Sequence, residues 1–104
     1  MAGSVFLDKS PTMYWHNQYK KSQALFNDIQ KREELGSELT PAMVQFRDTF
    51  AHHDGWIRSM NGSMARMSDE EKVQAQYAVR QNMRAAGVAG LDLQKEASWN
   101  LLSE

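Results

Sequence analysis

Apolar residues recur at helical spacing along most of the chain, and no run alternates apolar and polar residues in the way typical of a strand. The first helical stretch follows Ser10-Pro11, a pair that can cap and open a helix, and stops at Gly36, a residue that favours termination. We therefore predict a helix over residues 11–35. Its apolar face repeats at spacings of 4, 3, 4 and 3, through Trp15, Tyr19, Ser22, Phe26 and Ile29.

The second stretch carries the longest regular pattern in the chain. It opens with Thr40-Pro41, and eight residues spaced alternately by three and four then form a heptad seam: Met43, Phe46, Phe50, His53, Ile57, Met60, Met64 and Met67. We predict a helix over residues 41–60 that runs through Gly55, because the seam keeps its phase on both sides. Asn61-Gly62 is a common turn dipeptide and favours an end there, whereas the phase of Met64 and Met67 leaves continuation through Gly62 open.

A capping box opens the third predicted helix. The Ser68 hydroxyl can accept from the backbone of Glu71, while the Glu71 carboxylate can reach back to the Ser68 amide. We predict a helix over residues 69–86 that closes at Gly87. A shorter C-terminal helix is predicted over residues 91–102.

The predicted fold is therefore all-α, a small helical bundle of three main helices plus a short C-terminal helix. We assign residues 10–104 to a single helical domain and residues 1–9 to an N-terminal arm. Phe6 and Leu7 of this arm either pack against the domain or dock on a partner. A chain of 104 residues with 41% hydrophobic and 24% charged residues suits one independent core.

Charge and composition exclude several classes of function. The 12 Lys and Arg nearly balance the 13 Asp and Glu and are mixed along the chain, so there is no broad basic face for duplex DNA. The chain has no cysteine, no Gly-rich phosphate loop and no nucleophile elbow. We expect neither catalysis nor a cofactor. The apolar runs are too short to cross a bilayer, and a cytoplasmic protein without membrane contact is the expectation.

Two alternatives use chemistry that the sequence contains. A metal site at His52 and His53 is one, but neighbouring helical residues point about 100° apart, and Asp48 is better placed to pair with His52 four residues on. His53 lies on the seam, where a partly buried histidine is the simpler interpretation. The other alternative is a nucleic-acid-associated helical protein that uses Lys20, Lys21, Arg80 and Arg84.

Among the classes of function considered, protein interaction has the strongest physical support. The chain holds seven methionines, and flexible, polarisable methionine suits a surface that packs against another protein. The seam either fills the domain's own core or forms an interface. We predict a non-catalytic interaction, adaptor or regulatory module that binds itself as a homodimer, binds another helical protein, or does both. The predicted contact residues are Phe46, Phe50, His53, Trp56, Ile57, Arg58, Met60 and Met64.

Overall fold

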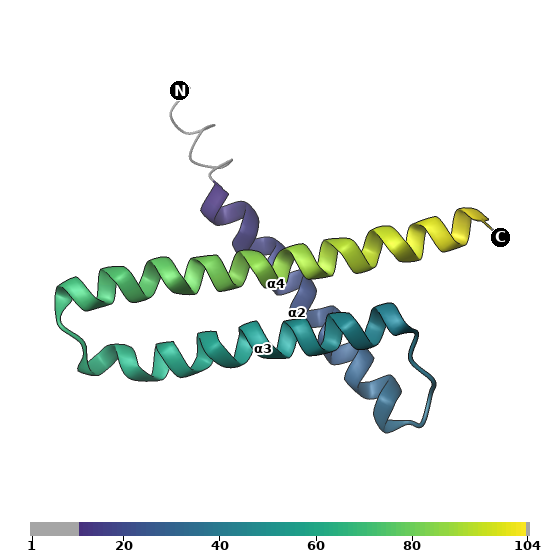
Figure 1. Ribbon diagram of the computed structural model, residues 1–104, viewed down its shortest axis with the longest axis horizontal. Coiled ribbons are helices and arrows are strands. Elements are labelled where there is room, and N and C mark those ends of the chain that lie inside the picture. The colour runs from purple at the N-terminus through teal and green to yellow at the C-terminus, as the bar shows by residue number, and fades with distance from the viewer. Residues whose placement is uncertain (1–10, 104) are drawn as a thin grey trace, which may run out of the picture.

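The computed structural model describes the backbone of residues 11–103 and the side chains of residues 13–96. This part of the chain contains helices and no strand: α2 (Pro11–Glu34), α3 (Pro41–Ser63), the short 3-10 turn η1 (Met64–Arg66) and α4 (Asp69–Ser103). Figure 1 shows α3 and α4 side by side as an antiparallel hairpin, with α2 crossing this pair at a steep angle. The all-α bundle is confirmed. The predicted arm over residues 1–9 and the Ser10 cap lie outside the described residues.

Gly36 ends α2, as predicted. It adopts φ +81°, a left-handed conformation that glycine reaches without steric cost. The Gly36 amide donates to the Glu33 carbonyl at 3.1 Å, and the Ser37 amide donates to the Arg32 carbonyl at 2.9 Å. This pair of hydrogen bonds is a Schellman motif, which satisfies carbonyls left open at a helix end.

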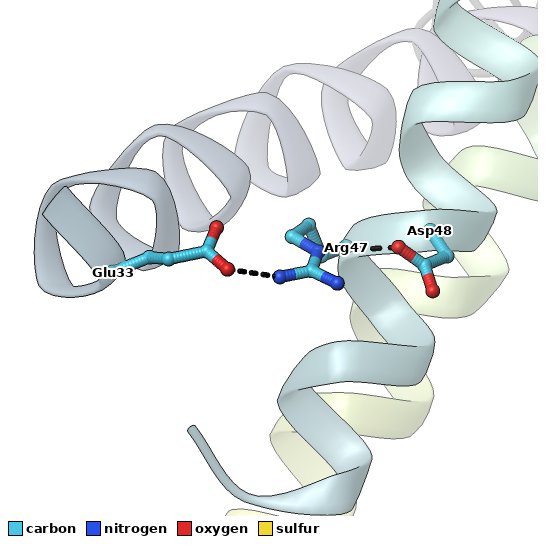
Figure 2. Close-up of polar contacts among 3 residues, drawn as sticks. All are labelled: Glu33, Arg47 and Asp48. Atoms are coloured by element: carbon cyan, nitrogen blue, oxygen red, sulfur yellow. Dashed lines mark hydrogen bonds and ion pairs between the residues drawn. The ribbon is translucent and has the colours of Figure 1, made fainter. Parts of the chain in front are cut away.

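Arg47 links α3 to the end of α2. Its guanidinium contacts the Glu33 carboxylate of α2, and its Nε donates to Asp48 Oδ1 at 3.1 Å (Figure 2). The hydrogen bond to Asp48, with a further contribution from Glu33, raises the pKa of Arg47 above its usual value. The charged guanidinium thus contacts carboxylates on both helices and ties α2 to α3 across the Gly36 turn.

Helix α3 begins at its predicted cap and ends later than predicted. Thr40 Oγ1 accepts a hydrogen bond from the Met43 amide at 3.2 Å. The helix runs through Gly55, as expected, but also through Gly62 to Ser63, so the predicted end at residue 60 is three residues early. Packing of the seam accounts for the extension, because Met60 and Met64 both lie half-buried.

Helix α4 begins at the predicted capping box. The Ser68 amide donates to Glu71 Oε1 at 3.0 Å, and the Glu71 amide donates to Ser68 Oγ at 3.2 Å. The backbone hydrogen bond from Ser68, followed by that of its side chain, lowers the pKa of Glu71.

The predicted end at residue 86 and the separate helix over residues 91–102 are wrong. One helix of 35 residues continues through Gly87 and Gly90. Both glycines are buried where α2 crosses α4: a methyl group on Gly87 would lie 3.0 Å from Gln18 Cβ, and one on Gly90 would lie 2.9 Å from Ser22 Cβ. The glycines therefore serve close helix packing here and do not terminate the helix.

The core is centred on Phe50 of α3, which is 1% exposed. Its ring packs against three other aromatic rings, with centroid distances of 4.8 Å to Phe26, 5.8 Å to Phe46 and 5.9 Å to Tyr19. Ile29 and Ala86 complete the buried cluster from α2 and α4. The predicted apolar face of α2 is thus part of the core, which lies where all three helices meet.

Candidate functional site

A groove of about 560 Å³ opens where the N-terminal half of α2 approaches the hairpin, and we call it the α2–α4 groove. Its volume is in the range of sites that hold a small ligand or a few side chains of a partner. Most of its lining comes from the first half of α4. The lining residues are Trp15 and His16 of α2, Asn61 of α3, Met64 of η1, and Gln76, Tyr77, Val79, Arg80, Gln81, Met83 and Arg84 of α4.

The helix crossing holds Trp15 at one wall of the groove. A methyl group on Gly87 would lie 3.2 Å from Trp15 Cε3, so the indole packs directly against the glycine backbone. One turn earlier on α4, the Arg84 guanidinium carbon lies 5.3 Å from the centroid of the Trp15 ring. This distance permits a cation–π interaction, which holds Arg84 at the groove while leaving its charge exposed.

The groove is apolar with a positive charge. Trp15, Tyr77, Val79 and Met83 supply apolar surface, and Arg80 and Arg84 supply two guanidinium groups, whereas no Asp or Glu is among the lining residues. Neither arginine forms an ion pair with another residue of the described part of the chain. In a protein of net charge −1, this combination favours an occupant that is both apolar and acidic.

Tyr77 connects the groove to the exposed surface of α4 beyond it. It is 65% exposed, and Val73, one turn earlier, is 66% exposed. Tyrosine and arginine side chains are enriched at the centre of protein interfaces.

Most of the predicted contact residues lie elsewhere. Phe46, Phe50 and Ile57 are between 1% and 4% exposed in the chain's own core. Another four of the predicted residues are half-buried: His53, Trp56, Met60 and Met64. Of the predicted set, Met64 alone is among the residues that line the groove. A partner could reach the buried three only if the helices separated, so their role in binding stays a prediction.

His53 connects α3 to α4. Its Nδ1 lies 2.8 Å from Asn82 Oδ1, and Asn82 Nδ2 donates to the Ala78 carbonyl at 2.9 Å. Since the second bond orients the amide with its oxygen toward the imidazole, His53 donates from Nδ1. The histidine therefore joins two helices on the seam.

The expected pairing of His52 with Asp48 does not form. Asp48 contacts Arg47 instead, and His52 is exposed, with its ring edge-on to His53 at a centroid distance of 5.1 Å. Within the described residues there is no group of three or more His, Asp or Glu side chains arranged to hold a metal ion. The residues of the nucleic-acid alternative are also divided, because Arg80 and Arg84 line the groove while Lys20 and Lys21 do not.

A polar cluster that was not predicted from the sequence joins α2 to α3. The Tyr19 hydroxyl donates to Asp54 Oδ1, and Arg58 Nε donates to Asp54 Oδ2 at 2.8 Å. Burial, followed by the hydrogen bond to Asp54, raises the pKa of Tyr19 to about 12. A signal was present: a tyrosine on an apolar face needs a hydrogen-bond partner for its hydroxyl, and Asp54 and Arg58 are four residues apart on one helix.

Comparisons of the chain with models of protein families, with curated proteins and with solved structures give no match. In the described part of the chain, every helix is too short or too polar to span a membrane.

Proposed function

We propose that this protein is a non-catalytic interaction module that binds an amphipathic helix of a protein partner in the α2–α4 groove. The observation that carries the proposal is the composition of the groove, in which apolar side chains and two arginines occur without a carboxylate. A helix fits such a surface when apolar residues on one of its faces enter the groove and acidic residues flank them. The partner helix is therefore expected to carry Asp or Glu beside its apolar anchors.

In this proposal the α2–α4 groove, and not the heptad seam of α3, is the surface that binds the partner. Burial of Phe46, Phe50 and Ile57 stabilises the fold, whereas Tyr77, Arg80 and Arg84 are exposed. Exposed groups reach a partner without the energetic cost of opening the bundle. An adaptor or regulatory role, in which the bound helix is the signal, is part of this proposal.

The side chains of the groove also support a role without catalysis. His16 and Tyr77 are lining residues of types that act as acids or bases in enzymes, and no Asp or Glu is among the lining residues to orient or activate either group. The arginines are suited to bind acidic groups and to orient them.

Selection of helical peptides against this protein tests the proposal. A library of amphipathic helices is displayed, binders to the wild-type chain are isolated, and backbone amide shifts are mapped by NMR. We expect peptides with apolar anchors and acidic flanks, and shifts concentrated at the groove. Tyr77→Asp should weaken binding by about tenfold or more, since it places a carboxylate in an apolar contact and near acidic groups.

Leu35→Asp is the matched control, because Leu35 is 84% exposed and does not line the groove. It makes a similar chemical change and should leave peptide binding unchanged. Peptides that bind the Tyr77→Asp and Leu35→Asp variants equally well, or a selection that returns no binder, would overturn the proposal.

A further inference from the structure

One stripe of α4 has an apolar centre and oppositely charged ends, and we call it the α4 face. It consists of residues spaced by 3, 4, 3 and 4, the spacing of a helix–helix seam: Glu70, Val73, Tyr77, Arg80 and Arg84. All five are exposed, in contrast to the seam of α3, whose members are buried or half-buried. The α4 face therefore has the pattern of a packing surface without a covering element in the described part of the chain.

The order of the charges makes this face complementary to itself. Glu70 precedes Tyr77 by seven residues, and Arg84 follows Tyr77 by seven residues. When two copies of α4 pack antiparallel about a two-fold axis at Tyr77, each Glu70 meets the Arg84 of the other copy. A parallel arrangement would instead place glutamate against glutamate and arginine against arginine. Such reciprocal pairing is the property of an isologous interface.

We propose that the helix bound by the α2–α4 groove is α4 of a second copy of this chain, packed antiparallel through the α4 face. This inference rests on the proposed function and names its partner. The two surfaces are contiguous, since Tyr77, Arg80 and Arg84 belong both to the α4 face and to the lining of the groove. Each copy brings the acidic group that its own groove lacks.

Within one copy, the charged and apolar side chains of the α4 face are exposed and available for this pairing. Trp15 holds Arg84 through the contact of 5.3 Å between guanidinium and ring, so the charge is already positioned at the groove. The neighbouring acidic residue Glu71 is engaged in the capping box with Ser68, whereas Glu70 forms no ion pair with any described residue. Val73 and Tyr77, each about two-thirds exposed, provide the apolar surface between the charged ends.

Sedimentation equilibrium tests the pairing when it is applied to the wild-type chain and to variants in which the charges at positions 70 and 84 are changed or exchanged. We expect a monomer–dimer equilibrium in the wild type. Arg84→Glu and Glu70→Arg should each weaken dimerisation by about tenfold or more, because either change sets like charges against each other at both ends. The double variant Glu70→Arg with Arg84→Glu should restore the dimer. Recovery of the dimer in the double variant would show that the single variants lost it through charge repulsion and not through misfolding.

Lys20→Glu is the matched control. It makes the same change in charge as Arg84→Glu on an exposed part of α2 that does not line the groove, and it should leave the dimer intact. A wild-type chain that stays monomeric up to about 1 mM, or a charge swap that fails to restore the dimer, overturns the α4 pairing. Groove-dependent peptide binding in the same monomeric sample would leave the proposed function standing, and loss of both would overturn both.

Discussion

Gly90→Ala should destabilise this protein, although alanine is the better helix former. Gly90 of α4 is buried against Ser22 of α2, which is 2% exposed. A methyl group there would lie 2.0 Å from Ser22 Oγ, 2.9 Å from Ser22 Cβ and 3.4 Å from Ser22 Cα. Rotation of the serine side chain can relieve the first contact. The second involves an atom attached directly to the α2 backbone, so α2 itself must move away from α4.

Two opposing contributions to the free energy of unfolding set the size of this destabilisation. Replacing glycine by alanine inside a helix gains about 1 kcal/mol through intrinsic propensity. Forcing an extra methyl group into a packed site costs roughly 1–3 kcal/mol, and the upper end applies at Gly90 because a whole helix is displaced. The expected net loss in the free energy of unfolding is about 2 kcal/mol, or about 10 °C in Tm for a domain of this size.

Urea and thermal denaturation followed by circular dichroism measure this loss. Gly55→Ala is the matched control, since no atom lies within 4 Å of the added methyl group, and it should stabilise the fold by about 1 kcal/mol. Ser22→Gly removes both close atoms and should recover part of the stability in the Gly90→Ala background. A Gly90→Ala variant as stable as the wild type would refute the close crossing of α2 and α4.

Three further substitutions test other parts of the fold. Burial and the hydrogen bond to Asp54 raise the pKa of Tyr19 from 10.0 to about 12 on folding, so the stability contributed by its hydroxyl is complete below pH 10 and is lost as the pH rises toward 12. Tyr19→Phe should therefore flatten that part of the pH profile of unfolding. Ser68→Ala should cost about 1 kcal/mol of stability by urea titration, because α4 loses its cap, and an unchanged midpoint would contradict the capping box. Phe50→Ala should cost about 3–5 kcal/mol through the cavity it leaves, whereas Leu35→Ala, at a side chain that is 84% exposed, should leave Tm nearly unchanged.

The features that the sequence predicted correctly depend on residues close together in the chain. The Thr40 cap, the capping box at Ser68 and the Gly36 terminus each involve groups within five residues of one another. The predicted helix end at Gly87 is wrong for the opposite reason, because Gly87 and Gly90 both pack against α2. Their role is set by Trp15, Gln18 and Ser22, which are more than 60 residues away in the sequence. Local helix propensity does not depend on such distant residues and so cannot predict that α2 crosses α4 at these glycines.

The sequence allowed individual residues of the candidate site to be predicted, but not their association in one groove. Arg80 and Arg84 were recognised as basic residues of one helix, and Trp15 as part of an apolar face. Their association needs the angle at which α2 crosses α4, since it brings Trp15 within 5.3 Å of Arg84 across 69 residues of chain. The seam of α3 was recognised by its period, but a period does not distinguish a core from an interface.

The crossing of α2 over α4 has a consequence for the order in which the protein is made. Ser22 is synthesised 68 residues before its packing partner Gly90. At roughly 5–20 residues per second, α2 waits about 3–14 s for the surface of α4 that buries it. During that interval α3 is the described helix that the apolar face containing Phe26 and Ile29 can contact. Assembly of the core therefore depends on α4, which is synthesised after α2 and α3, and a nascent chain stalled within α4 would present that apolar face to chaperones.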